Sequence, residues 1–111
     1  MTNKQYRLCV AEAENYTDRD AYISDLALSS IWEDTADAEI PDERIRALGE
    51  IWDACNRTVK QIAADAGISC RAMAERFCIP YRTVEDWSTG HRESPMYVRL
   101  MMQELLGLLH R

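Results

Sequence analysis

The chain has 111 residues, of which 47% are hydrophobic, and its formal net charge is −6. This length fits one domain with a core of its own, and no apolar run approaches the roughly 18 residues that a membrane-spanning helix needs. No apolar signal-peptide core follows residues 1–5, so we expect a cytoplasmic protein without a membrane partner.

The spacing of apolar residues predicts helices along the whole chain and no strand. The first predicted helix carries apolar residues three and four positions apart, at Tyr6, Cys9, Val10 and Ala13. Thr17 with Asp20 resembles a capping box, which predicts a second helix that runs to about Glu33. Apolar residues cover much of this second helix, so it is either central to the fold or partly buried by another chain.

Residues 33–39 are acidic, small and polar, which predicts a loop. Pro41 and the acids Asp42 and Glu43 then predict the start of a third helix, since proline suits the first turn and acids favour the positive end of the helix dipole. A further capping box, Thr58 with Gln61, predicts a helix that ends at Gly67.

Residues 70–89 are typical of two short helices joined by a sharp turn, with Ser69 as the cap of the first. Apolar residues share one face of each helix, at Met73, Ala74 and Phe77 in the first and at Val84 and Trp87 in the second. Pro80 predicts the start of the second helix, because its ring fixes φ and it has no N–H to donate. A pair of this size with a polar outer face fits a DNA major groove.

Ser94 and Pro95 predict the start of a last helix. Its inner residues are expected to be Val98, Met101, Met102, Leu105 and Leu109. Further apolar residues lie outside this stripe, at Leu100, Leu106 and Leu108. They indicate either a homodimer surface, shared with the helix that holds Leu28 and Trp32, or a core helix covered by the N-terminal half.

The segment over residues 70–89 resembles the helix-turn-helix of the lambda-repressor/Cro (XRE-like) family, and the likeness extends over about residues 58–109. With Cys70 as the first of twenty positions, Ala74 falls on the family's small fifth position, and the apolar residues around it fall on the buried ones. We therefore expect an all-α fold of five to six helices. Residues 1–56 would form an acidic helical N-terminal region, and residues 57–111 a lambda-repressor-like helix-turn-helix region, together one compact domain.

Cys78 departs from this pattern, because the family usually has glycine there. The turn residue commonly needs a positive φ, which a side chain resists at roughly 1–2 kcal/mol. We expect a strained Cys78 or a slightly relaxed turn.

The negative charge is unevenly distributed. Residues 1–56 carry five Lys or Arg against thirteen Asp or Glu, a balance of −8, whereas residues 57–111 carry eight against six, a balance of +2. Only charges within about 10 Å of a phosphate act on it strongly at physiological salt. The C-terminal half could therefore bind DNA, but with weak non-specific affinity.

The resemblance implies which residues contact double-stranded DNA. Positions that match Tyr81, Arg82 and Asp86 commonly face base edges, and Arg82 could pair bidentately with guanine. Tyr81 could pack on a thymine methyl group or reach a phosphate, and Thr83 could do either. Asp86 with its neighbour Glu85 could accept from cytosine N4, or both could form a solvated face that pairs with Arg82 in the free protein.

Phosphate contacts are implied at Arg71, near the start of the first helix of the pair, and at the turn with His91 and Arg92 after the second. Ordinary surface solvation is the alternative for each arginine. The four cysteines form no CxxC pair, and we expect buried free thiols at Cys9, Cys55, Cys70 and Cys78. No catalytic motif or zinc spacing stands out, so we expect neither an enzyme nor a metal or cofactor.

The sequence thus predicts sequence-specific binding to double-stranded DNA by a small transcriptional regulator of bacterial or phage type. The alternative is an acidic protein-interaction module, such as an antitoxin, inhibitor or DNA mimic, on a helix-turn-helix scaffold. It would bind a basic protein partner through acids of the N-terminal half, at Glu33, Asp34, Asp37, Glu39, Asp42 and Glu43.

Overall fold

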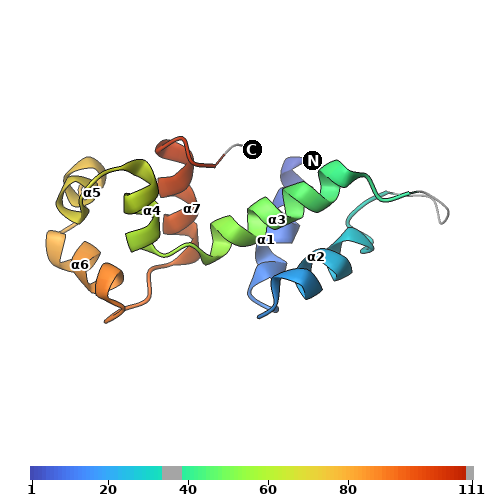
Figure 1. Ribbon diagram of the computed structural model, residues 1–111, viewed down its shortest axis with the longest axis horizontal. Helices are drawn as coiled ribbons and strands as arrows, with labels where there is room; N and C mark the ends of the chain where they lie inside the picture. The colour runs from blue at the N-terminus through green and yellow to red at the C-terminus, as the bar shows by residue number, and fades with distance from the viewer. Residues whose placement is uncertain (34–38, 110–111) are drawn as a thin grey trace. The chain divides into compact units, whose positions relative to one another are not determined.

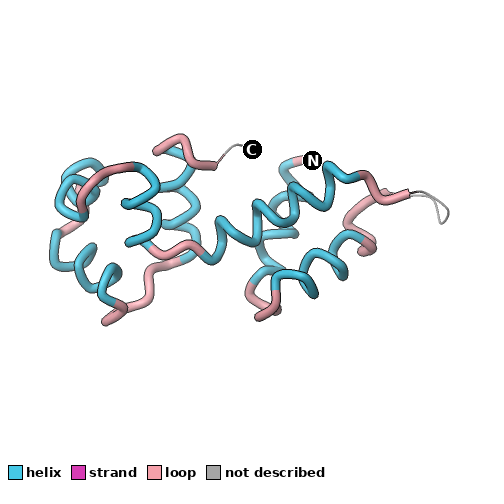
Figure 2. The backbone as a smooth tube through the Cα atoms, in the orientation of Figure 1, coloured by secondary structure: helices cyan, strands magenta, loops and turns pink. Residues whose placement is uncertain are grey.

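The computed structural model describes residues 1–33 and 39–109. Every regular element in these ranges is an α-helix, as Figure 2 shows, which confirms the predicted all-α class. The described ranges hold seven helices, where five to six were predicted. In chain order they are α1 (Asn3–Ala13), α2 (Arg19–Ala27), α3 (Asp42–Asn56), α4 (Val59–Ala66), α5 (Cys70–Phe77), α6 (Tyr81–Thr89) and α7 (Met96–Leu105).

The chain divides into two compact units, Met1–Cys55 and Asn56–Arg111. The first unit contains α1, α2 and all but the last residue of α3, and the second contains α4 to α7 (Figure 1). No helix within the described residues combines the length and the apolar character that crossing a membrane requires.

The first unit is built around Tyr22, which is fully buried on α2. Its ring packs against Trp52 of α3 with 5.2 Å between ring centroids. Its hydroxyl donates a 2.7 Å hydrogen bond to the Cys9 carbonyl of α1, so one side chain ties three helices together. Burial raises the pKa of the Tyr22 phenol well above its ordinary value, so the hydroxyl remains a donor.

The start of α2 differs from the prediction by one residue. Thr17 is not the cap, because the Asp18 carboxylate accepts the N–H of Ala21 at 3.2 Å and takes that position. The helix therefore begins at Arg19. Two adjacent residues able to cap, Thr17 and Asp18, left the sequence ambiguous here.

The end of α2 was also predicted wrongly, because the helix stops at Ala27 and does not reach Glu33. The Leu26 carbonyl near this end accepts a 2.8 Å hydrogen bond from the Trp32 indole N–H, so a side chain takes part in closing the helix. Leu28 is the C-cap and is 75% exposed. Leu28 and Trp32 therefore do not lie on a common helix.

The predicted boundaries of the next helices are confirmed. Asp42 and Glu43 form the first turn of α3, where carboxylates favour the positive end of the dipole. Thr58 and Gln61 form a reciprocal capping box at the start of α4. Gly67 ends α4 with a φ of 70°, which glycine adopts without steric cost.

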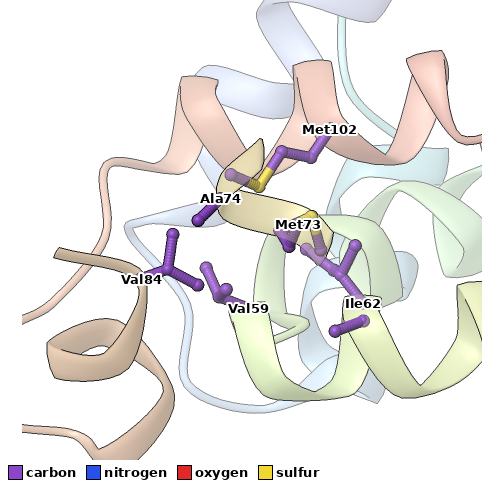
Figure 3. Packing of buried hydrophobic residues seen from close by; sticks show 7 residues of the cluster. Val59, Ile62, Met73, Ala74, Val84 and Met102 are labelled. Carbon is purple, nitrogen blue, oxygen red and sulfur yellow. The ribbon is translucent and has the colours of Figure 1, made fainter. Parts of the chain in front are cut away.

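The core of the second unit lies between its four helices, and α4 packs against α5, α6 and α7. Figure 3 shows the buried side chains gathered there. They come from all four helices and are Val59, Ile62, Ala63, Met73, Ala74, Val84 and Met102. Because Val84 of α6 is fully buried here, this core fixes which side of α6 faces outward.

The predicted inner stripe of α7 is wrong at two positions. Met101 is 52% and Leu105 62% exposed, whereas Val98 and Met102 contact the core. Residues four apart follow one stripe of a helix, and the neighbouring stripe lies about 100° away. The prediction merged two such stripes, of which the core covers one.

The chain after α7 returns to the core, which was not predicted. Gly107 has a φ of 75°, and the N–H of Leu108 donates to the Gln103 carbonyl at 2.8 Å. Leu106 and Leu108 consequently pack against the core cluster, although the sequence placed them outside the inner stripe of the last helix. Leu109 is 8% exposed and thus lies inside, as predicted.

The four cysteines do not share one environment. Cys9 and Cys55 are buried cysteines outside any disulfide, as predicted, but Cys70 is half-buried and Cys78 is exposed. Burial raises the pKa of the Cys9 thiol, so this group is a poor nucleophile. The prediction of buried thiols is therefore wrong for Cys78.

Candidate nucleic-acid interface

Local hydrogen bonds define both ends of α5. At its start, the Ser69 hydroxyl accepts the N–H of Ala72 at 3.0 Å, as predicted for a cap. At its end, the N–H of Ile79 donates to the Ala74 carbonyl at 3.0 Å and closes the last turn. Residues 78–80 therefore connect α5 to α6 with little conformational freedom of the backbone.

Cys78 provides the left-handed residue of this turn. Its φ is 54° and its ψ 40°, and it is the only non-glycine residue in the described ranges with a positive φ. The expected left-handed conformation is confirmed. A side chain in this conformation costs roughly 1–2 kcal/mol, so the junction before α6 is strained where glycine would not be.

We expect Cys78→Gly to stabilise the second unit by about 1 kcal/mol. Glycine removes the steric cost of the positive φ, and the greater entropy of its unfolded chain offsets part of that gain. Urea unfolding monitored on the second unit measures the effect. Cys78→Ala is the matched control, since it removes the thiol but keeps the β-carbon. A lower free energy of unfolding for the glycine variant than for the alanine variant would contradict the left-handed assignment of residue 78.

The helix α6 begins at Tyr81 and ends at Thr89, with Gly90 as its C-cap, as predicted. Pro80 precedes it with a φ of −53°, a value that its ring imposes. Val84 is fully buried, and Trp87 packs against the same core cluster. The opposite side of α6 therefore faces away from the core, and most of the candidate residues lie there or close by.

Tyr81 and Arg71 form one pair of candidate residues. The Arg71 guanidinium lies 4.2 Å from the centroid of the Tyr81 ring, and Tyr81 remains 38% exposed. Such a cation–π contact holds both side chains in place while leaving the guanidinium able to donate. The start of α5 and the start of α6 thus present one joint surface.

Arg82, Asp86 and Arg92 form a second group. Arg82 Nε lies 3.8 Å from one Asp86 carboxylate oxygen and Arg92 Nε lies 3.9 Å from the other. The Arg82 side chain is 86% exposed, the Arg92 side chain 76% and the Asp86 side chain only 16%. Asp86 therefore lies beneath two outward-facing arginines, and the Arg82 pair expected in the free protein is present.

The other candidate residues stand apart from these groups. Thr83 is half-buried on α6, and His91 is exposed in the turn after it. Glu85 is exposed on α6 next to Asp86. No ion pair recorded for the described residues includes Glu85, so of the two neighbouring acids only Asp86 joins the arginines.

Two features of this surface were missed by sequence reasoning. The stack of Arg71 on Tyr81 joins two helices, and the contact of Arg92 with Asp86 joins a loop to a helix. Neither spacing is a recognised pattern, because both depend on how α5, α6 and the loop fold together. Only the Arg82–Asp86 pair has the four-residue spacing that predicts contact on a helix.

The acidic segment predicted as an alternative interface is only partly described. Asp34 and Asp37 lie outside the described residues, whereas Asp42 and Glu43 open α3. In the described ranges, no three His, Cys, Asp or Glu side chains are grouped as metal ligands would be.

Comparison of the chain with family models, curated proteins and solved structures finds no match. The likeness to the lambda-repressor/Cro family therefore stays a prediction from the residues quoted above. The surface of α5, α6 and the loop that follows is the candidate functional site.

Proposed function

We propose that this chain binds double-stranded DNA sequence-specifically, as a small transcriptional regulator of bacterial or phage type. In this proposal α5 and α6 form a lambda-repressor-like helix-turn-helix, and α6 enters the major groove. The observation that carries the proposal is the two-sided character of α6: Val84 is fully buried, while the Arg82 side chain is 86% exposed. A helix whose inner face packs on the core and whose outer face exposes a guanidinium group is suited to contact bases.

The arginines around α6 would have two roles, base contact and phosphate contact. Arg82 lies within the first turn of α6 and would contact base edges. Arg71 at the start of α5 and Arg92 after α6 flank it, where they would bind phosphates and set the register. Tyr81, which Arg71 covers, would pack on a thymine methyl group or donate to a phosphate.

Asp86 has a particular place in this proposal. Its carboxylate contacts both Arg82 and Arg92, so it restrains two DNA-facing side chains and cancels part of their charge. Restraint favours discrimination between bases, and charge cancellation weakens binding to any DNA. We therefore assign Asp86 to the positioning of the arginines, in keeping with the small +2 balance of this half.

Asp86→Asn is expected to tighten binding to random duplex DNA several-fold and to reduce the preference for the best site. The substitution removes one negative charge near the phosphates and releases Arg82 and Arg92. Fluorescence anisotropy with a specific and a random duplex measures both effects. Glu85→Gln, which removes the same charge without releasing an arginine, should tighten both complexes equally. Identical behaviour of the two variants would exclude a positioning role for Asp86.

The salt dependence of binding to random duplex DNA tests the proposal as a whole. We expect detectable affinity at low salt that falls steeply as salt is raised, because phosphate contacts release counterions. Arg92→Ala should lower the slope of log K against log salt by about 1. Arg46→Ala, at an exposed site of the first unit, is the charge-matched control and should leave the slope unchanged.

The opposite outcome has a definite meaning. Undetectable binding even at low salt would contradict the DNA-binding proposal. It would favour the acidic protein-interaction module, whose partner would be a basic protein.

Dimerisation is part of the proposal. The exposed apolar residues of α7 lie four apart, at Tyr97, Met101 and Leu105, and are between 52% and 67% exposed. They form one stripe that a second copy of the chain could cover. A two-fold dimer would place two α6 helices about 34 Å apart, one turn of DNA. Its operator would then be palindromic.

A further inference from the structure

A pocket of about 430 Å³ opens in the second unit, at the start of α4 and beside the loop that follows α6. Its volume falls within the roughly 300–1,000 Å³ typical of small-molecule sites. The side chains that matter for its chemistry are Arg57, Thr58, Trp87, Arg92, Glu93 and Arg99. Apart from Arg92, none of these residues belongs to the proposed DNA surface.

The charge of this lining is positive. The lining contains three arginines, Arg57, Arg92 and Arg99, and one acidic residue, Glu93. The N-terminus of α4 adds to the positive potential, because its N-cap Thr58 and its first residue Val59 line the pocket. A cavity with this lining attracts anions.

Two of the three arginines are fixed in place by the protein. Arg57 donates a 2.8 Å hydrogen bond to Gln103 Oε1, and Gln103 is fully buried on α7. Arg99 donates to the backbone carbonyl and, at 3.1 Å, to the hydroxyl of Ser94, which is itself buried. Because these arginine side chains are already ordered, binding a ligand costs less of their conformational entropy.

Arg57 and Arg92 retain capacity for a ligand. Each guanidinium has five N–H donors, and the partners of Arg57 are Gln103 and Asp65, whose carboxylate lies 3.5 Å from Nε. Arg92 is 76% exposed, and its contact with Asp86 is long, at 3.9 Å. Guanidinium groups pair best with planar or tetrahedral oxyanions, to which two parallel N–H groups can donate.

We propose that this pocket is an oxyanion site, which binds a small phosphorylated or carboxylated molecule. Arg57 and Arg99 provide fixed donors, Arg92 closes over the anion, and the indole of Trp87 forms an apolar wall. Binding of the anion would draw Arg92 away from Asp86, and it would thereby change the outer surface of α6. The site stands on the pocket alone and does not require that the chain bind DNA.

Titration of the full chain with inorganic phosphate, followed by amide NMR at constant ionic strength in chloride, tests the site. We expect saturable shifts of the amides of Thr58 and Gly90 and of the Trp87 indole. The amide of Ala72 at the start of α5 is the internal control and should not saturate, although Arg71 lies nearby. If the amide shifts near every cationic surface change linearly with phosphate concentration, the effect is ionic screening only, and the proposal is overturned.

Three variants make the test specific. Arg57→Gln should weaken phosphate binding about tenfold, the loss of a charge-assisted hydrogen bond. Glu93→Gln, at an exposed position that does not endanger folding, should tighten it several-fold. Arg46→Gln should change nothing. Equal affinities for the wild type, Arg57→Gln and Glu93→Gln would contradict the site.

A parallel titration with duplex DNA in place of phosphate distinguishes the source of the anion. If free phosphate saturates the pocket in the absence of DNA, its ligand is a small molecule, as proposed. If the pocket amides respond only to the duplex, the pocket holds a backbone phosphate and the small-molecule proposal is wrong. A chain that binds phosphate but no DNA would keep this site and lose the proposed function.

Discussion

Replacing Arg82 with alanine is expected to lower discrimination between the preferred and a mismatched site by about 1–3 kcal/mol, or roughly 5- to 150-fold. The Arg82 side chain is 86% exposed, and its guanidinium can donate two parallel hydrogen bonds to guanine. Alanine removes both bonds, while Arg71 and Arg92 keep their places around α6. Affinity for random duplex DNA should therefore fall much less than affinity for the preferred site.

Anisotropy titrations on the preferred site, a singly mismatched site and a random duplex measure this prediction. Arg82→Lys is the informative control, because lysine keeps the charge but lacks the planar fork that pairs bidentately. It should retain non-specific binding and lose most of the discrimination. Equal losses of Arg82→Ala on all three duplexes would remove Arg82 from base recognition and leave it a phosphate contact at most.

Met73→Ala is expected to destabilise the second unit by about 2–5 kcal/mol. Met73 is fully buried on α5, within the cluster that fixes the inner side of α6. The loss of its side chain leaves a cavity that the four helices cannot fill without moving. Because domains of this size are stable by only about 5–15 kcal/mol, much of the second unit would unfold at moderate urea concentration.

Urea unfolding, followed by the amide signals of α4 to α7, gives the free energy of unfolding for this unit. Met101→Ala on α7 is the matched control, because the same side chain is 52% exposed there and its loss should cost no more than about 0.5 kcal/mol. Similar costs for the two variants would mean that Met101 is covered, either by the rest of the chain or by a second copy. That result would restore the originally predicted inner stripe of α7.

The helices could be predicted wherever the signal is local. The capping box of Thr58 and Gln61, the stop at Gly67 and the start at Pro80 depend on residues within one turn. The inner face of α5 and α6 was likewise visible in the spacing of Met73 and Val84. The left-handed conformation of Cys78 was expected from the resemblance, because the family usually has glycine at that position.

Features that depend on tertiary contacts could not be predicted. The early end of α2 involves a hydrogen bond from Trp32, six residues after its acceptor Leu26. The return of Leu108 to the core depends on the positive φ of Gly107 and on a core cluster built from four helices. Such partners have no fixed spacing, so a pattern of apolar residues does not reveal them.

The candidate site was predictable as a set of positions and not as an arrangement. The resemblance placed Arg71, Tyr81, Arg82 and Arg92 around one helix. It gave no sign that Arg71 stacks on Tyr81 or that Asp86 contacts Arg92 as well as Arg82. The anion pocket was also missed, because Arg57, Arg92 and Arg99 are far apart in the sequence and meet only in the folded unit.

Selection of bound sequences from a random duplex pool tests the central claim most directly, namely that the outer side of α6 recognises DNA. We expect the wild type to enrich a palindromic site with half-sites about one helical turn apart. The Arg82→Ala variant should lose the preference for guanine at one position of each half-site. A wild-type pool that stays as random after several rounds at low salt as it was at the start would contradict the claim.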